Sequence, residues 1–352
     1  ENDKSILHLR RAALDLDAPA TERVHSALAL SPMLVQMGLA GLAHSILAPL
    51  MDAAVLASLT NEWQCAMADL MLHGRDFDRL HEFIDQSDGS YESNAHQSAW
   101  LLRKGKLALA EERFSDAKSL LEEAAALGES PAIDHAQGQS MAAMDEWEEA
   151  VPWLEKASQN LVDPLERTHA LIDLGRVLQD LGRSKPSDRA FAEAAALGGD
   201  EPPIMALILH HRFQGATARV ALDEAREHVE RELEQRKRCG DQAGHARAHI
   251  QSGLLDLVQH DPASAGVHFH AALDLCRGSG FHTIEAQALT FHGIAARLSG
   301  DFGTALDAFV EAAALTEEGG HAISVPCGDC YRLPWAKRGG LCRNRLLPRQ
   351  VC

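Results

Sequence analysis

Three stretches of the chain are near-copies of one another, and they constrain the fold more than any other feature of the sequence. They read KSLLEEAAALGE at 118–129, RAFAEAAALGGD at 189–200 and DAFVEAAALTEE at 307–318. Each places a large apolar residue shortly before Glu-Ala-Ala-Ala-Leu, a composition that favours helix. A segment repeated in this way predicts a stack of similar helical units.

Each copy is the second half of a longer unit that contains a glycine. A small residue follows this glycine after twelve residues, a large apolar residue after sixteen and Ala after nineteen. The units with this spacing are Gly105 with Ala117, Leu121 and Ala124; Gly138 with Ala150, Leu154 and Ala157; Gly175 with Ser187, Phe191 and Ala194; Gly253 with Ala265, Phe269 and Ala272; and Gly293 with Ala305, Phe309 and Ala312. Small residues let helices approach closely, and Leu or Phe fills the space between them. The spacing therefore predicts antiparallel helix pairs packed in series.

Turn residues separate the two halves of a unit. Three examples are Glu112-Arg113-Phe114, Asp145-Glu146-Trp147 and Gly300-Asp301-Phe302. We expect the second helix to begin after each turn, and we expect the aromatic residue there to cover the core of the helix pair.

This order of Gly, Ala, Leu or an aromatic residue, and Ala resembles the tetratricopeptide repeat family, whose unit is a helix–turn–helix of about 34 residues. The resemblance covers residues 95–198 and 240–320, with Leu101 in place of the usual aromatic residue and Ser187 in place of Ala. It implies an all-α fold, a right-handed α-solenoid. Gly253 and Gly293 lie 40 residues apart, which is similar to the long-helix repeats of bacterial regulatory and signalling proteins.

The repeats divide the chain into five expected segments. These are degenerate N-terminal helical repeats at 1–94, tetratricopeptide-like repeats at 95–200, an irregular repeat or connector at 201–239, long-helix repeats at 240–320 and a basic tail at 321–352. The third segment contains ALDEAREHVERELEQRKR at 221–238, which fits either a solvated connector or a degenerate repeat. We favour the degenerate repeat, because an array must cover the apolar face that each unit presents to the next.

Charge and cysteine content limit the class of protein. The formal net charge is −18; residues 321–352 hold one acid and six bases, a net +5, which leaves −23 on residues 1–320. An acidic surface repels phosphate backbones, so we do not expect the body of the chain to bind nucleic acid. Cys65, Cys239 and Cys276 are scattered singly, which is typical of a cytoplasmic protein rather than a secreted disulfide framework.

One apolar stretch has the length of a membrane span. Residues 26–51 contain no Asp, Glu, Lys or Arg. We expect two short buried helices instead, because Ser31 and Pro32 form a typical helix start and Pro49 interrupts the run. We therefore expect no membrane partner.

No catalytic motif stands out. The sequence has no GxxxxGK[ST] loop and no GxGxxG or GxSxG in the context of a strand, so we expect neither enzyme activity nor a cofactor. Asp241, His245 and His249 share one expected helix face, but the line spans about 12 Å. Since Asp241 is also placed to cap the helix, we expect no metal there. His210, His211, His268 and His270 are expected to be ordinary helix-face residues.

The tail holds the remaining cysteines, Cys327, Cys330, Cys342 and Cys352. The first pair has the CxxC spacing of a zinc site, whereas the second pair does not. Three interpretations stay open: a frame-altered or unstructured tail, a zinc module, and a disordered functional arm.

The resemblance also implies a binding groove lined by the first helix of each unit. Its expected residues directly follow the glycines: Lys106, Gln139 and Arg176, then Leu254 and Ile294. Residues three positions before the glycines add Leu102, His135 and Ile172, then Ile250 and Thr290. The first part is partly basic and the second is apolar. The alternative is that these positions are solvated helix surface with no ligand.

Two functions follow as hypotheses. The first is a non-enzymatic scaffold that binds a peptide or partner domain in the groove, where Lys106, Arg176 and His135 would attract a local carboxylate. The second is the sensor region of a larger bacterial transcriptional regulator or signalling protein whose effector domain is absent from this chain. The carboxylate clamp of chaperone-binding family members is not matched, because Gln139 and Arg176 occupy its positions. The oligomeric state stays open.

Overall fold

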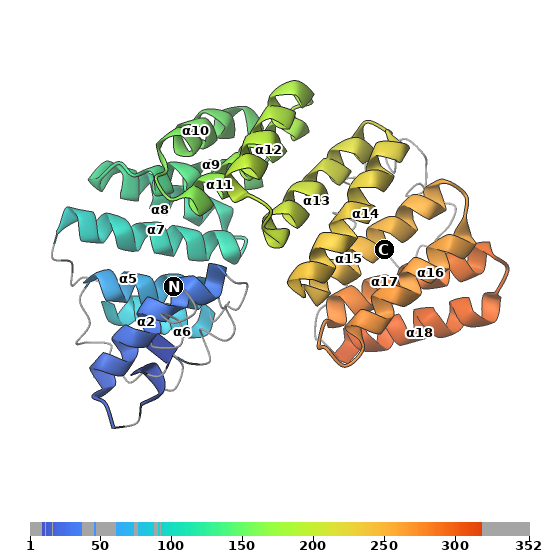
Figure 1. Ribbon diagram of the computed structural model, residues 1–352, viewed down its shortest axis with the longest axis horizontal. Coiled ribbons are helices and arrows are strands. Elements are labelled where there is room, and N and C mark those ends of the chain that lie inside the picture. Colours follow the sequence, from blue (N-terminus) through green and yellow to red (C-terminus); the bar gives the residue numbers. More distant parts are fainter. Residues whose placement is uncertain are drawn as a thin grey trace. The chain divides into compact units, whose positions relative to one another are not determined.

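The fold is seen in a computed structural model that describes residues 9–10, 12–15, 17–36, 46, 61–73, 77–87, 91 and 93–318. The chain divides into two compact units, residues 1–190 and 191–352, and the boundary falls inside one helix. Every regular element in the described part of the chain is a helix (Figure 1).

The first unit contains the helices α2 to α11 and the start of α12. Their bounds are α2 Ala20–Gln36, α5 Asn61–His73, α6 Phe77–Ser87, α7 Asn94–Ala110, α8 Phe114–Leu127, α9 Pro131–Ala143, α10 Trp147–Asn160, α11 Pro164–Asp180 and α12 Ser184–Gly198. Within this unit α7 pairs with α8 and α9 with α10, and α8 and α10 each pack on the next helix along the chain.

The second unit continues from α12 through three further pairs. The bounds are α13 Pro202–Ala218, α14 Leu222–Cys239, α15 Gln242–Val258, α16 Pro262–Cys276, α17 His282–Leu298 and α18 Phe302–Glu318. Consecutive helices from α13 to α18 lie side by side (Figure 1). Both units are therefore built by stacking helix pairs.

The predicted contact between each glycine and the large residue sixteen positions later is confirmed in four repeats. A Cβ atom added to Gly138 would stand 2.6 Å from Cγ of Leu154, and one added to Gly253 would stand 2.6 Å from Cε1 of Phe269. The same approach is 2.8 Å for Gly105 with Leu121 and for Gly293 with Phe309. These distances are too short for any residue with a side chain, so the glycines are where the paired helices touch.

The Ala residues nineteen positions after the glycines occupy the same packed seams. Ala157 and Ala272 have no exposed surface. We expect Ala157→Leu or Ala272→Leu to lower the free energy of unfolding by about 1–3 kcal/mol, because three extra carbon atoms would force the helices apart. Urea unfolding followed by circular dichroism measures this, with the exposed Ala126→Leu on α8 as the control. Equal midpoints for seam and control variants would contradict the repeat register.

A regular turn joins the two helices of each pair. The residue seven positions after each repeat glycine, or after Phe213, is left-handed, with φ between 60° and 85° at Glu112, Asp145, Gly182, Val220, His260 and Gly300. The following N–H donates to the carbonyl five residues earlier, as from Arg113 to Ala108 at 2.8 Å and from Asp301 to Ala296 at 2.9 Å. This is the Schellman ending of a helix, and it reverses the chain direction at the same point of every pair.

The irregular segment 201–239 follows the same register, with one exchange. Phe213 stands where the other repeats have Gly, and Ala225, Val229 and Glu232 follow it after twelve, sixteen and nineteen residues. Phe213 and Val229 share one core cluster. A large residue on α13 and a smaller one on α14 thus fill the space that Gly and Phe or Leu fill elsewhere. The structure accordingly shows this segment as a helix pair, α13 with α14.

Two local expectations are wrong. Ser31 and Pro32 do not begin a helix, because α2 starts at Ala20 and runs through both; the buried residues Val24, Ala27 and Leu28 on its first turns hold the helix by packing. Phe302 does not cover a core, since 70% of it is exposed. It lies on the outer face of α18, the last described helix, whereas Trp147 packs against the core of its unit as expected.

Other expectations concern the N-terminal region and the tail. Leu80 and Ile84 of α6 are buried and Phe77 packs against them, so this helix has the expected apolar face. None of the described helices is both long and apolar enough to cross a bilayer. Most of 37–60 and all of 321–352, with Cys327, Cys330, Cys342 and Cys352, lie outside the described residues.

Candidate functional site

The expected groove positions fall into two groups in the structure. The residues that directly follow the glycines, Lys106, Gln139, Arg176, Leu254 and Ile294, are all half-buried on the first helices. Three positions before the glycines, His135 and Thr290 are also half-buried. Leu102, Ile172 and Ile250 are buried. Leu102 and Ile250 belong to core clusters, so the expectation that these three apolar residues line a groove is wrong: an apolar side chain at this position folds back into the core.

Three of the expected groove residues lie around one carboxylate, that of Asp173 on α11. His135 Nε2 donates to Asp173 Oδ2 at 2.8 Å, and Gln139 Nε2 donates to the same oxygen at 2.8 Å. Arg176 Nε lies 4.0 Å from Asp173 Oδ1, and its Nη1 lies 3.6 Å from Asp180 Oδ2. We call His135, Gln139, Asp173 and Arg176 the α9–α11 cluster.

The electrostatics of this cluster centre on Asp173. Burial alone would raise the pKa of Asp173, but the hydrogen bond and charge of His135, the charge of Arg176 and the hydrogen bond from Gln139 together lower it to about 2. Asp173 is therefore ionised at neutral pH and neutralises much of the local positive charge. Among the described residues Lys106 has no ion pair, so it is the cation of this row whose charge is not shared.

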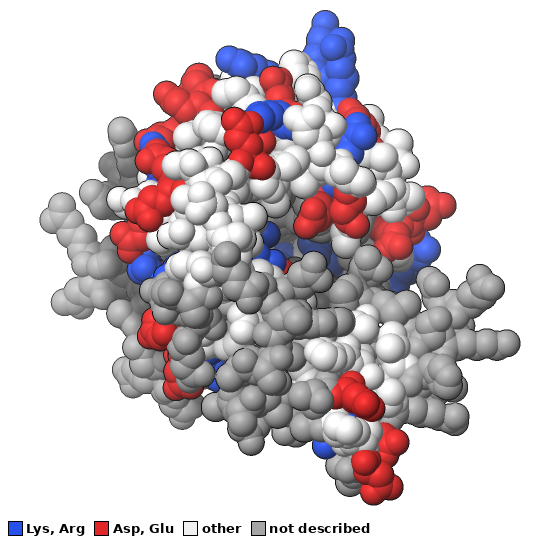
Figure 2. Space-filling model, turned by 90° about the vertical axis from the view of Figure 1, so that its left-hand side faces the viewer, with Lys and Arg blue, Asp and Glu red and all other residues white. Residues whose placement is uncertain are grey.

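One face of the molecule carries charges of both signs. On the face drawn in Figure 2, groups of acidic residues spread over the described part of the surface with bases between them. A ligand carboxylate would therefore be attracted only close to a single cation such as Lys106, within about 8 Å at physiological salt.

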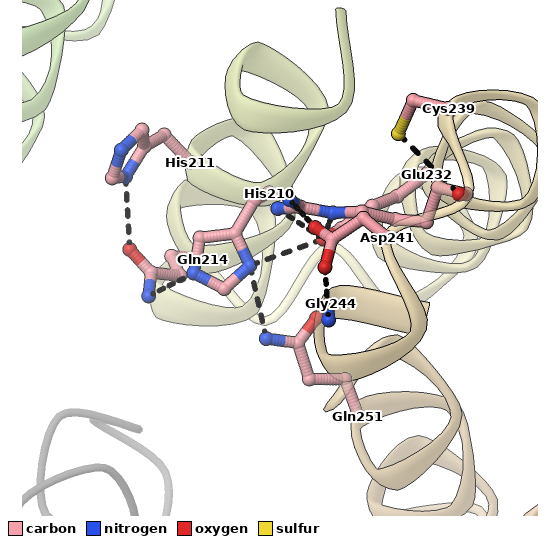
Figure 3. A network of polar contacts seen from close by, with 9 residues as sticks. His210, His211, Gln214, Glu232, Cys239, Asp241, Gly244 and Gln251 are labelled. Carbon is pink, nitrogen blue, oxygen red and sulfur yellow. Dashed lines mark hydrogen bonds and ion pairs between the residues drawn. The ribbon is translucent and has the colours of Figure 1, made fainter. Parts of the chain in front are cut away.

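A second cluster joins α13, α14 and α15 (Figure 3). His210 Nε2 lies 3.1 Å from Gln214 Nε2, and His210 Nδ1 lies 3.4 Å from Glu232 Oε1 and 3.1 Å from Gln251 Nε2. Gln214 Oε1 accepts from Nδ1 of His211 at 3.3 Å. We call His210, Gln214, Glu232 and Gln251 the α13–α15 cluster.

Glu232 is the buried centre of this cluster. It is only 1% exposed, and Arg236 donates to its Oε1 from Nε at 3.3 Å and from Nη2 at 3.2 Å. Its other oxygen, Oε2, has no hydrogen-bond partner in the described part of the chain. Glu232 occupies the position that carries Ala in the regular repeats, so a buried carboxylate has replaced a methyl group at a packed seam.

The groups around His210 favour one tautomer. Because Gln214 Nε2 can only donate, His210 Nε2 is the acceptor and the proton lies on Nδ1, where it is directed to Glu232. With the amide of Gln251 turned so that its oxygen faces Nδ1, that oxygen also accepts from His210. His211, Gln214 and His210 thus form a series of hydrogen bonds, and Nδ1 of His210 faces the Glu232 carboxylate at 3.4 Å.

The two clusters share one arrangement. Each has His three positions before the repeat position and Gln directly after it: His135 and Gln139 around Gly138, and His210 and Gln214 around Phe213. In each, the histidine contacts the residue two positions before the glycine of the next first helix, which is Asp173 in one and Gln251 in the other. The sequence alone does not single out His210 and Gln214, because the repeat position between them carries Phe213 in place of glycine. The spacing to Ala225 and Val229 was the signal that reveals them.

The one-helix metal arrangement of Asp241, His245 and His249 is not formed. Asp241 Oδ1 accepts from Gly244 N at 2.8 Å as the N-cap of α15, and its Oδ2 accepts from Arg236 Nη1 at 2.7 Å. Within the described residues no three side chains of His, Cys, Asp or Glu are already arranged to hold a metal ion. The described clusters offer paired donors and acceptors on a rigid helix face, which suits recognition of a polar ligand.

Comparison with known proteins places the fold. No protein-family model and no curated protein sequence matches the chain. A STAND signal-transduction ATPase with a tetratricopeptide repeat sensor from Pyrococcus horikoshii is similar over 91% of this chain and 54% of its own, with a TM-score of 0.58 and 12% identity.

Two further structures are similar over most of their length. The apo quorum sensor NprR from B. thuringiensis matches over 85% of this chain and 100% of its own, with a TM-score of 0.53 and 10% identity. A Rap protein complexed with competence and sporulation factor matches over 80% and 87%, with a TM-score of 0.53 and 13% identity. At these identities the similarity establishes the fold alone. The chain has an all-α repeat fold of the tetratricopeptide type.

Proposed function

We propose that the chain is a non-enzymatic scaffold that binds an extended peptide segment along its first helices, through the α9–α11 cluster or the α13–α15 cluster. One observation carries the proposal: the same His and Gln arrangement recurs at equivalent positions in both units, among repeats that otherwise pack through Gly, Ala, Leu and Phe. Amide and imidazole groups can donate to and accept from the main chain of an extended peptide.

The stability cost of the polar groups supports a binding role. A buried carboxylate with one unpaired oxygen, such as Glu232, destabilises a fold that Ala would pack without penalty. Positions that break the local rule of a repeat in this way are expected at functional sites. The half-buried Gln139 and Gln214, each held by its own histidine or carboxylate partner, would be pre-oriented for a ligand.

The structural neighbours support the partner-binding part of the proposal. NprR is a quorum sensor, and the Rap structure contains competence and sporulation factor. For this chain, we infer binding of a comparable segment from the shared fold. The two clusters supply the residues that would contact it.

The cysteine thiols of the described helices also fit a scaffold rather than an enzyme. Burial raises the pKa of Cys276 to about 11, and burial raises the pKa of Cys65 as well. Both are therefore protonated at neutral pH, and a protonated thiol is a poor nucleophile.

Selection from a random peptide library tests the proposal. The full chain is expected to enrich peptides with a common pattern, and Gln139→Ala combined with Gln214→Ala is expected to weaken their binding at least tenfold. The matched control is Gln159→Ala with Gln242→Ala, which removes two exposed amides outside the clusters and should bind as the wild type does. Affinities are measured by fluorescence anisotropy. Failure to enrich any pattern, or equal affinity of both double variants, would contradict the proposal.

A charge-reversal variant refines the test for acidic peptides. Arg176→Glu would place a third carboxylate beside Asp173 and Asp180, and it would disturb the fold as well as binding. Lys106→Glu avoids this problem, and it is expected to weaken acidic peptides selectively and most strongly at low salt. Lys185→Glu, an exposed charge reversal on α12, is its control.

A second candidate function is favoured by the surface of α18. Phe302, Leu306 and Val310 are 70%, 63% and 61% exposed and follow one another at four-residue intervals on one helix face. In the α9–α10 pair the residues equivalent to the first two, Trp147 and Val151, pack into the core of their unit. An apolar row of this kind fits a sensor region that packs against a further domain. Reading the coding sequence on both sides of this segment would reveal whether an effector domain adjoins it.

A further inference from the structure

Three histidines outside the two clusters lie together on the neighbouring helices α15 and α16. Nδ1 of His249 lies 3.1 Å from Nδ1 of His268. The ring centroids of this pair are 5.4 Å apart, and the ring of His245, one turn earlier on α15, has its centroid 4.9 Å from that of His249. Helix pairing thus adds His268 to the two histidines that the sequence places on one helix face.

The distances match those between ligands of one tetrahedral ion. Two imidazole nitrogens bound at 2.0–2.1 Å in a tetrahedral site are about 3.3 Å apart, and their ring centroids are about 5 Å apart. The nitrogens of His249 and His268 that face each other are close to this separation already. In the absence of an ion, one of these two nitrogens donates a hydrogen bond to the other. A bound ion would take the place of this proton.

A buried carboxylate faces His268 from its other side. Asp256 is 4% exposed, and its Oδ1 accepts from Arg226 Nη2 at 2.6 Å. Its Oδ2 has no hydrogen-bond partner among the described residues and lies 3.8 Å from Nε2 of His268. A carboxylate on this side favours the tautomer with the proton on Nε2, which leaves Nδ1 unprotonated for a metal. Carboxylates beside the second nitrogen are common in histidine metal sites.

We propose that His245, His249 and His268 bind one zinc-class divalent transition-metal ion, with Asp256 orienting His268. His245 completes the set by rotation of its side chain, since no three metal-binding groups of the described chain already converge. The three rings are half-buried, which leaves a path for the ion and a position open to water or to a ligand group. Asp241 takes no part, because it caps α15 and bonds Arg236.

Metal titration of the full chain, stripped with a chelator and dialysed, tests the site. Calorimetry with Zn²⁺ is expected to show a site that His249→Gln or His268→Gln weakens at least a hundredfold and Asp256→Asn weakens about 10- to 100-fold. The exposed His282→Gln on α17 should leave the affinity unchanged. Circular dichroism of each metal-free variant shows that it is folded.

Cobalt distinguishes this site from the cysteines of the tail. Co²⁺ bound by the three histidines should give visible bands without the near-ultraviolet charge-transfer band of a thiolate ligand. Loss of the visible bands in His249→Gln and His268→Gln, with retention in His282→Gln, would support the proposal. Zinc affinity that is the same in His249→Gln and His268→Gln as in the wild type, or a cobalt spectrum showing thiolate ligands alone, would overturn it.

Discussion

Phe269→Ala is expected to lower the free energy of unfolding of the second unit by about 3–5 kcal/mol. Phe269 has no exposed surface, and its ring lies on Gly253 and stacks with Phe291 at a centroid distance of 5.8 Å. Truncation leaves a cavity between α15 and α16 that glycine cannot fill. Urea unfolding followed by circular dichroism measures the loss, and Val267→Ala, 70% exposed on the same helix, is the control. A loss as small as that of Val267→Ala would show that Phe269 does not hold the pair together.

The glycine opposite Phe269 gives an independent check of the same seam. A Cβ on Gly253 would lie 2.6 Å from Cε1 of the ring, so Gly253→Ala alone is expected to cost about 1–3 kcal/mol by overpacking. Combined with Phe269→Val, which shortens the facing side chain as Val229 does opposite Phe213, the same Ala should cost less. A double-mutant cycle measures this coupling. The α13–α14 pair already contains a related compensation, since Phe213 replaces the glycine there and Val229 replaces the large residue.

The helix pairs were predictable because the same packing pattern recurs several times along the sequence. One glycine and one phenylalanine carry little information, but the same spacing at Gly105, Gly138 and Gly253 identifies the close helix contact that the structure contains. The left-handed turn residue was not predictable in the same way. It lies seven positions after each repeat glycine or after Phe213, yet Glu112, Asp145, Val220 and His260 hold that conformation without being glycine. The hydrogen bonds of the helix end impose it against local preference.

The candidate site was only partly predictable, because it depends on contacts across helices. His135, Gln139 and Arg176 follow from the register, but the carboxylate that joins them, Asp173, lies one position outside the rows that the family resemblance indicates. Glu232 stands on a second helix at an Ala position, where sequence alone gives no reason to expect a charge. His268 likewise meets His249 only because α15 and α16 pair.

Local signals failed where packing decides the outcome. Ser31 and Pro32 have the sequence of a helix start, yet α2 continues through them. Proline in a helix interior costs about 3 kcal/mol, and burial of several side chains such as Leu28 and Leu30 offsets a cost of this size. Ile250 shows the same principle at the groove, where its apolar side chain lies in the core although its polar equivalent His135 does not.

Acid is expected to destabilise the first unit through Asp173. The pKa of Asp173 is about 2 in the fold against the ordinary value of 3.8, so folding favours its ionised form. This contribution is fully present above about pH 4–5 and is lost as the pH falls through about 2. A difference of nearly two pH units corresponds to about 2 kcal/mol. Protonation of Asp173 removes the acceptor of His135 and Gln139 and leaves Arg176 with one carboxylate fewer.

Asp173→Asn isolates this effect from the other carboxylates with lowered pKa, such as Glu111 and Glu224. At pH 7 the variant should be less stable than the wild type by about 2 kcal/mol, and the difference should shrink toward zero between pH 4 and pH 2 because the wild type then loses the same charge. Asp188→Asn, at an exposed position of α12, should leave stability nearly unchanged over the same range. Urea midpoints at half-unit pH steps give the three curves. A difference between wild type and Asp173→Asn that stays constant down to pH 2 would mean that the α9–α11 cluster is held by shape and hydrogen bonding rather than by the charge of Asp173.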